Sequence, residues 1–166
     1  MSSKPYSDMQ NQAAILIESG MRIALVHSMT GLPMRMLRDL WSAIHGELKP
    51  PGRMPYNSIA YIKNGQSVTG LAMVVSVYLY AKKERKSIVE SFLSAWEASQ
   101  LSADSDSNLD INAAWYAVRD VKAGIITWCR CNRCGAGYIL DTKMTRKSDG
   151  CNYCGTMGKK IIGVAQ

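Results

Sequence analysis

The chain has 166 residues and a mass of 18.3 kDa, enough for one compact domain with a small appendage. Hydrophobic residues make up 47% of it, which excludes a wholly disordered protein. The net charge of +7 favours a polyanionic partner or an anionic surface. This charge is uneven, because residues 112–166 carry nine basic and three acidic groups.

The N-terminal residues 2–12 are polar, which predicts that the chain has no secretory signal. The most apolar run, residues 71–81, is shorter than the roughly 20 residues that a membrane-spanning helix needs. All five cysteines lie between residues 129 and 154, and an odd number without an export signal argues for a reducing compartment. We therefore expect a cytoplasmic protein that does not bind a membrane.

The first predicted helix has apolar residues at helical spacing over residues 13–25. Gly31 then interrupts the pattern, and Pro33 suits the first turn of a second helix, expected over residues 33–45 and ended by Gly46. The apolar face of this second helix would comprise Met36, Leu37, Leu40, Trp41 and Ile44. The opposite, polar face would comprise Arg35, Arg38, Ser42 and His45.

This helix, turn and second helix have the outline of a helix-turn-helix. In that interpretation Arg35, Arg38 and Ser42 would face DNA phosphates or base edges. The alternative is that two arginines on a soluble helix form a solvated face. The pattern is degenerate, and the residues alone leave both interpretations open.

The remaining elements also follow from local patterns. The proline-rich segment 49–55 cannot be helical, and the acidic, serine-rich segment 102–107 indicates a loop. Three further helices are predicted by apolar periodicity and by a capping aspartate, followed by β-like fragments: helices over 68–80, over 88–99 and after Asp110 up to Gly124, and fragments at 125–128, 138–140 and 160–164. We expect a mainly α protein with a helical body at residues 1–124 and a zinc ribbon at 125–166.

Two copies of Cys-Asn-X-Cys-Gly occur near the C-terminal end, and sixteen residues separate their cysteine pairs. This spacing indicates a tetrahedral four-cysteine metal site. We predict that one structural Zn²⁺ is bound by Cys131, Cys134, Cys151 and Cys154. Four thiolates fill the coordination shell and leave no open position for catalysis. A thiol–disulfide centre and an iron–sulfur cluster are the alternatives. Cys129 is left over, either as a partly buried thiol or as a replacement for Cys131.

Basic residues flank this predicted metal site. Arg130 and Arg133 lie at the first cysteine pair, and Lys143, Arg146 and Lys147 lie between the pairs. Basic groups on a rigid metal-bound scaffold contact phosphates at little entropic cost, so we expect nucleic-acid binding. The alternative is that these residues serve only solubility. No Ser-His-Asp set, phosphate-binding glycine loop or paired carboxylates are recognisable, so an enzyme is not expected.

The sequence resembles the FlhC family, the subunit of the flagellar master transcriptional activator. The resemblance rests on Thr30-Gly31-Leu32 with Arg35, Leu37 and Leu40 after it, on residues 48–55, on Ala114-Trp115 and Val118-Arg119 before Gly124, and on the paired cysteines. It implies a non-enzymatic activator subunit that binds promoter DNA together with an FlhD-type partner in a hetero-oligomer. It also implies the same four-cysteine zinc site.

We therefore expect a DNA-binding activator that recruits RNA polymerase. Flagellar members of the family usually extend further beyond the second cysteine pair, and similar subunit pairs activate conjugative transfer, so the controlled operons are expected to be flagellar or conjugative. The alternative function is a non-catalytic zinc-ribbon protein or an RNA interaction module.

Overall fold

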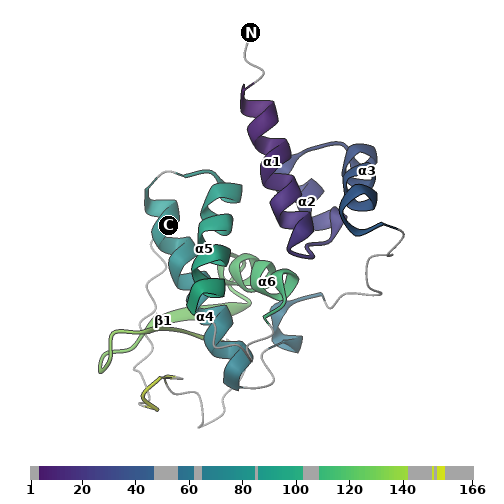
Figure 1. Cartoon of the computed structure of the whole chain (residues 1–166). Helices are drawn as coiled ribbons and strands as arrows, with labels where there is room; N and C mark the ends of the chain where they lie inside the picture. Colours follow the sequence, from purple (N-terminus) through teal and green to yellow (C-terminus); the bar gives the residue numbers. More distant parts are fainter. Residues whose placement is uncertain are drawn as a thin grey trace.

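The computed structural model describes residues 4–46, 56–61, 65–84, 86–102, 109–141, 151 and 153–155. In Figure 1, α1 to α3 lie together at one end, and α4 to α6 lie at the other end with the β-hairpin beside them. The elements of the described chain are α1 (Lys4–Glu18), α2 (Ile23–Thr30), α3 (Met34–His45), the 3-10 turn η1 (Ser58–Ala60), α4 (Gly65–Lys83), α5 (Ile88–Ser102), α6 (Ile111–Lys122), β1 (Ile126–Arg130) and β2 (Gly137–Asp141). The protein is mainly α, as predicted.

A break between α1 and α2 shows that the predicted continuous helix over residues 13–25 was wrong. Gly20 adopts a left-handed conformation with φ 86°, which glycine reaches without a steric cost. Its N–H donates to the Ile17 carbonyl at 2.8 Å, and the Met21 N–H donates to the Leu16 carbonyl at 2.9 Å. This is a Schellman turn that ends α1. Met21 stays buried after the turn, so the apolar spacing continues although the helix does not.

The predicted second helix is α3, and its ends agree with the sequence. Pro33 is the N-cap residue and Gly46, with φ 64°, is the C-cap residue. The turn before α3 contains Gly31, whose N–H donates to the carbonyl of His27 at 2.8 Å. Helices α2 and α3 thus form a helix-turn-helix outline, although its first helix is α2 and not the predicted helix over residues 13–25. Leu37 and Trp41 of α3 are buried.

Helix α4 is central, as its apolar sequence predicted. It packs against α5, α6 and both strands. One apolar core extends from α1 through α4 and α5 to the hairpin, so burial of apolar surface holds the helices together. Its largest fully buried side chains include Leu16, Ile17, Leu71, Tyr78 and Phe92.

Helix α6 begins at the predicted cap, where the Asp110 side chain accepts a hydrogen bond from the Asn112 N–H at 2.8 Å. The buried Asn112 side chain also reaches the turn between α1 and α2. Its Oδ1 accepts from the Arg22 N–H at 3.0 Å, and its Nδ2 donates to the Gly20 carbonyl at 3.2 Å. One side chain therefore satisfies two backbone groups of a turn about 90 residues away in sequence.

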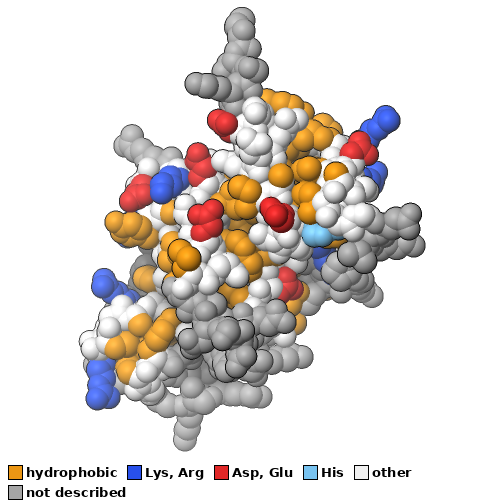
Figure 2. Space-filling view, in the orientation of Figure 1, with side chains coloured by type: hydrophobic (Ala, Val, Ile, Leu, Met, Phe, Trp, Pro, Cys, Tyr) orange, Lys and Arg blue, Asp and Glu red, His pale blue; other side chains and the backbone are white. Residues whose placement is uncertain are grey.

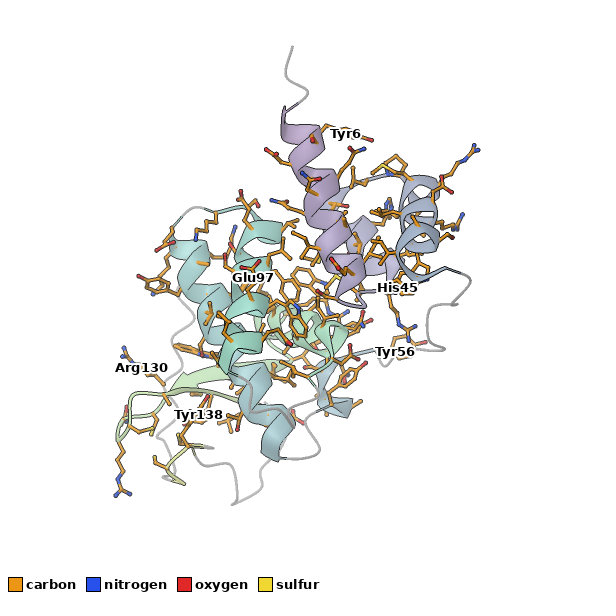
Figure 3. All side chains as sticks on the ribbon, viewed as in Figure 1. Tyr6, His45, Tyr56, Glu97, Arg130 and Tyr138 are labelled. Carbon is orange, nitrogen blue, oxygen red and sulfur yellow. The ribbon has the colours of Figure 1, made fainter. Side chains whose placement is uncertain are left out.

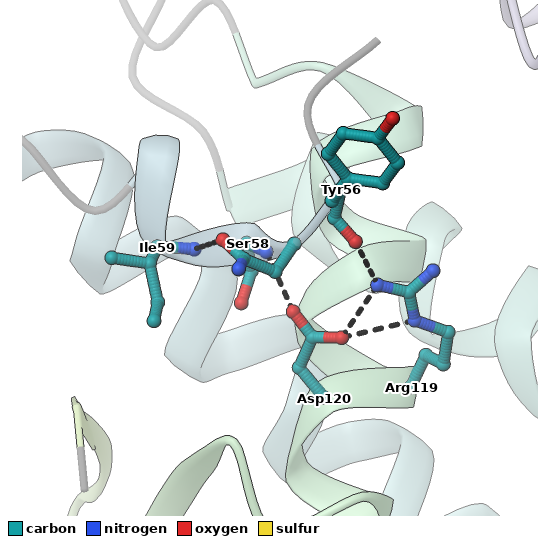
Figure 4. Close-up of polar contacts among 6 residues, drawn as sticks. Tyr56, Ser58, Ile59, Arg119 and Asp120 are labelled. Carbon is teal, nitrogen blue, oxygen red and sulfur yellow. Dashed lines mark hydrogen bonds and ion pairs between the residues drawn. The ribbon is translucent and has the colours of Figure 1, made fainter. Parts of the chain in front are cut away.

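The other end of α6 holds the segment before α4 (Figure 4). Asp120 is fully buried, and its Oδ2 accepts from the Ser58 N–H at 2.6 Å. The Arg119 guanidinium donates to Asp120 Oδ1 through Nε at 2.9 Å and through a terminal nitrogen at 2.8 Å. That same terminal nitrogen donates to the Tyr56 carbonyl at 2.6 Å. The buried carboxylate is thus compensated by hydrogen bonds from two separate parts of the chain.

Strands β1 and β2 form an antiparallel pair in which Trp128 lies opposite Ile139 and Cys129 opposite Tyr138. Because side chains alternate between the two faces of a strand, the hairpin presents two different surfaces. One face, with Trp128 and Ile139, joins the core of the helical body, and the other, with Cys129 and Tyr138, joins a second cluster containing Cys131 and Cys151.

Several predicted features lie outside the described residues. They are the β-fragment at 160–164, the proline-rich segment 49–55 and nearly all of the serine-rich loop 102–107. The division into a body at residues 1–124 and a ribbon at 125–166 stays a prediction.

Candidate metal centre

The structure brings the four predicted ligands together. The sulfur atoms of Cys131, Cys134, Cys151 and Cys154 all lie within 4.8 Å of one another, in a group that could hold a metal ion. The Sγ–Sγ distances are 3.5 Å for Cys131–Cys154 and 3.5 Å for Cys134–Cys151. A tetrahedral site with metal–sulfur bonds of about 2.3 Å requires sulfur atoms about 3.8 Å apart, so the observed spacing fits such a site.

Both cysteine pairs are shaped by the same short turn. The Gly135 N–H donates to the Cys131 carbonyl at 2.9 Å, and the Gly155 N–H donates to the Cys151 carbonyl at 2.8 Å. Each glycine has a positive φ, 75° and 67° respectively. Side-chain-bearing residues rarely adopt this conformation, so the repeated glycine after each second cysteine has a conformational role.

The electrostatic environment of the first cysteine pair shifts the pKa values of its two thiols in opposite directions. Backbone N–H groups of Cys134 and Arg133 lower the pKa of Cys131 below its ordinary value. The backbone N–H of Ala136 also favours the Cys134 thiolate, but burial and the three neighbouring thiols outweigh it and raise the pKa of Cys134 to about 12. Four thiols this close do not all ionise without a compensating cation. A bound metal ion would supply that positive charge.

Cys129 lies on the same face of the hairpin but outside the group of four. It is buried, opposite the buried Tyr138 across the strand pair. Burial raises the pKa of Tyr138, and the negative charge of Cys129 and nearby thiolates adds to the effect. The geometry therefore agrees with the interpretation of Cys129 as a buried thiol, with Cys131 in the metal group.

The predicted DNA-contacting residues fall into two separate groups. Arg130 and Arg133 are exposed at the hairpin, and the Arg130 Nε donates to the Gly135 carbonyl at 3.1 Å. Arg35, Arg38 and Ser42 are exposed on α3. Figure 2 shows Lys and Arg side chains at the lower left, over the hairpin, and at the upper right, over α3. Lys143, Arg146 and Lys147 lie outside the described residues.

His45 does not belong to the open polar face of α3. Its Nε2 lies 2.8 Å from the Ile17 carbonyl, and its ring contacts Trp41 at a centroid distance of 4.3 Å. The side chain is half-buried, so it joins the end of α3 to the end of α1. Figure 3 shows His45 at the α3 end and Arg130 at the opposite end of the molecule.

Two polar contacts were not expected from the sequence. One is the hydrogen-bond set around Asp120, and the other joins the Trp128 Nε1 to the Ser76 Oγ at 2.9 Å. Ser76 is the one small polar residue within the apolar run 71–81, and that exception could have indicated a specific contact on α4. No comparable signal marks Asp120.

In the part of the chain that the structure describes, no helix combines the length and apolar character needed to cross a membrane.

Known proteins resemble this chain along most of its length. The family described as "Flagellar transcriptional activator (FlhC)" matches residues 4–161. The flagellar transcriptional regulator FlhC of Enterobacter cloacae is 30% identical over 152 residues, covering 89% of this chain and 79% of that protein. The FlhC regulators of Verminephrobacter eiseniae and Yersinia enterocolitica are each 26% identical, covering 81% and 84% of this chain and 75% and 74% of their own lengths. The chain belongs to the FlhC family of flagellar transcriptional activators.

Proposed function

We propose that this chain is the DNA-binding subunit of a transcriptional activator that works in the cytoplasm as a hetero-oligomer with an FlhD-type partner. The complex binds promoter DNA and recruits RNA polymerase to flagellar or conjugative-transfer operons. The observation that carries this proposal is the family match over residues 4–161, which includes the helix-turn-helix outline and both cysteine pairs.

We further propose that the metal is one structural Zn²⁺ bound by Cys131, Cys134, Cys151 and Cys154, within a ribbon at residues 125–166. Thiolate ligands favour zinc, and four of them leave no position for substrate or water. The close sulfur spacing and the glycine turns support this assignment. The metal would fix two turns whose described surroundings form only a small buried cluster.

The first group of proposed DNA contacts comprises Arg130 and Arg133 of the hairpin, together with Lys143, Arg146 and Lys147 from the sequence between the cysteine pairs. Arg130 is braced by the Gly135 carbonyl within a turn that carries two of the sulfur atoms, so less side-chain entropy is lost on phosphate binding. A second contact is proposed for Arg35, Arg38 and Ser42 on α3. Because α3 and the hairpin lie at opposite ends of the molecule, the two groups would touch different stretches of DNA.

A gel-shift titration tests DNA binding. Zinc-loaded chain, with its FlhD-type partner, is titrated onto a candidate promoter duplex and onto a random duplex of equal length at several salt concentrations. We expect a preference for the promoter and a log–log salt slope of about −0.9 per phosphate contacted. A flat salt response would contradict DNA binding. Equal affinity for both duplexes would favour the alternative, a zinc-ribbon protein or RNA interaction module.

Substitutions then show which of the two basic groups contributes to DNA binding. Replacing Arg130 and Arg133 by Ala should reduce the magnitude of the slope by about 0.9 for each phosphate that is no longer neutralised, and replacing Arg35 and Arg38 should act likewise. If replacing one pair of arginines leaves the salt slope unchanged, that pair does not contact DNA phosphates. The conservative control replaces the same arginines by Lys, which retains the charge.

Genome-wide occupancy of a tagged copy identifies the controlled operons. We expect peaks upstream of flagellar or conjugative-transfer genes and recovery of the FlhD-type partner with the tagged chain. Occupancy without promoter enrichment would contradict the proposal.

A further inference from the structure

The hairpin has its metal-binding face on one side and a close contact with α4 on the other. Three residues make that contact, Trp128 of β1, Gly137 of β2 and Ser76 of α4, and we call it the hairpin–α4 contact. The Trp128 Nε1 donates to the Ser76 Oγ at 2.9 Å, and the Ser76 hydroxyl donates to the Ala72 carbonyl at 2.7 Å. The hydroxyl orientation is therefore set by α4, which leaves its oxygen as the acceptor for the indole.

Gly137 makes this approach possible through its size. A Cβ atom at this position would lie 2.6 Å from the Trp128 Nε1 and closer still to the Ser76 Oγ. Neither atom belongs to a long flexible side chain that could move aside. The Trp128–Ser76 hydrogen bond and the Ser76–Ala72 hydrogen bond also hold both atoms in place. Any side chain at residue 137 would therefore move the hairpin away from α4.

The same hairpin carries the first cysteine pair at its turn. Trp128 precedes Cys131 by three residues, and Gly137 follows Cys134 by three residues. The Cys131 N–H donates to the Ala136 carbonyl at 2.8 Å, which closes the base of the turn directly after the last strand pair, Arg130 with Gly137. The metal group and the hairpin–α4 contact thus share one short, hydrogen-bonded unit.

We propose that the hairpin–α4 contact couples metal occupancy of the cysteine group to the helical body, with Ser76, Trp128 and Gly137 as positioning residues. This inference rests on the proposed metal centre. Metal binding fixes the turn, the turn fixes the register of β1 and β2, and that register places the Trp128 indole on Ser76. By linkage, docking of the hairpin on α4 pre-organises the turn. It raises the affinity of the cysteine group for the metal by the same factor by which metal binding favours docking.

The spectroscopic test uses Trp128 as a reporter in the full-length chain loaded with one equivalent of Zn²⁺. Removing the metal with a chelator should shift the tryptophan emission of the unsubstituted protein, because Trp128 leaves its half-buried site on α4. In Trp128→Phe the metal-dependent shift should be absent, although Trp41, Trp96 and Trp115 remain. An equal shift in both proteins would overturn the proposal.

The coupling test measures zinc affinity by chelator competition in Ser76→Ala, which lacks the indole acceptor and touches no cysteine. A net hydrogen bond has a modest effect, so we expect the affinity to fall about fivefold, and to fall further in Gly137→Ala, where the hairpin is displaced. The control Val89→Ala, in the core of α5, should lower the unfolding temperature without changing zinc affinity. Gly70→Ala, where the new Cβ meets only the flexible Leu109 side chain at 3.3 Å, should be neutral for zinc.

The outcomes are distinct. If the unsubstituted chain binds no stoichiometric metal by elemental analysis, the proposed metal centre is wrong and the coupling falls with it. If the chain binds one Zn²⁺ but Ser76→Ala and Gly137→Ala retain full affinity, the metal centre stands and the coupling is refuted.

Discussion

In the helical body, side chains such as Leu16, Leu71 and Phe92 are removed from water by several packed helices. At the cysteine end, the buried cluster of the described residues is Cys129, Cys131, Tyr138 and Cys151. The body therefore spreads its stability over many apolar contacts, each worth a few kcal/mol at most. The described residues of the cysteine end have few such contacts, so we expect their order to depend on the four sulfur atoms and the ion proposed between them. The two regions should consequently respond to different perturbations.

Metal removal should give the largest difference between them. Cys151→Ser, or a strong chelator, should abolish metal binding, which in small zinc modules contributes on the order of 10 kcal/mol to folding. Helical circular dichroism at 222 nm should be largely retained, because the core of the body contains no cysteine ligand. Elemental analysis measures the bound metal, and circular dichroism spectra with and without the metal measure the helix content.

The matched control for this change is Cys129→Ser. Cys129 is buried beside the group of four but is not part of it, so stoichiometric metal should be retained. Loss of metal in Cys129→Ser with retention in Cys151→Ser would reverse the ligand assignment.

A cavity in the helical body should destabilise the helices and leave the cysteine group unchanged. Phe92 is fully buried, with an edge-to-face contact to Trp115 at 5.2 Å between ring centroids. Phe92→Ala should lower the free energy of unfolding by about 3–5 kcal/mol. Urea denaturation followed at 222 nm measures this loss. Leu101→Ala, at an 89% exposed position, should change stability by less than about 0.5 kcal/mol, and equal effects of the two substitutions would contradict the described core.

The Asp120 network tests whether polar contacts also hold the body together. Asp120→Ala should destabilise the protein by about 2–3 kcal/mol, because the Ser58 N–H loses its acceptor in a buried position. The exposed Asp39 on α3 is a matched control whose replacement by Ala should be nearly neutral. Thermal unfolding of both variants distinguishes them, and a neutral Asp120→Ala would show that the segment around Ser58 is held by other contacts.

The smallest effect concerns pH at the start of α5. The Ser87 backbone N–H donates to Glu90 Oε2 at 2.8 Å, and the Glu90 N–H donates to Ser87 Oγ at 3.1 Å, a capping box. The backbone N–H and then the hydroxyl of Ser87 lower the pKa of Glu90 below its ordinary 4.5. A lowered folded-state pKa means that this stabilisation is present above pH 4.5 and is lost as the pH falls through and below that value.

Glu90→Gln removes that dependence, because an amide does not titrate. The stability difference between the two proteins should be largest near neutral pH and should close as the pH falls below 4.5. An NMR titration of the Glu90 carboxyl gives its pKa directly. A difference that is constant with pH would contradict the capping-box interpretation.

The features that the sequence predicted are those encoded by a few neighbouring residues. Each Cys-x-x-Cys pair, the Asp110 cap and the Gly46 helix end all act within one turn of chain, and all are present. The meeting of the two cysteine pairs was predictable because their spacing matches a known type of metal site. The break at Gly20 was missed because the buried Met21 keeps the apolar periodicity through the turn. Asp120 with Ser58 and Trp128 with Ser76 were missed for another reason. Their partners are 62 and 52 residues apart, a distance over which local patterns carry no information.

The Asn112 side chain has a consequence for the order in which the chain folds as it leaves the ribosome. The turn at Gly20 and Arg22 receives its hydrogen bonds from a residue synthesised about 90 positions later. At translation rates of roughly 5–20 residues per second, α1 and α2 wait about 5–18 s for that partner. The first helices therefore reach their final arrangement only after α6 has emerged. A nascent chain arrested before residue 112 should consequently be cleaved by protease at the α1–α2 turn, and one arrested well beyond α6 should be protected there.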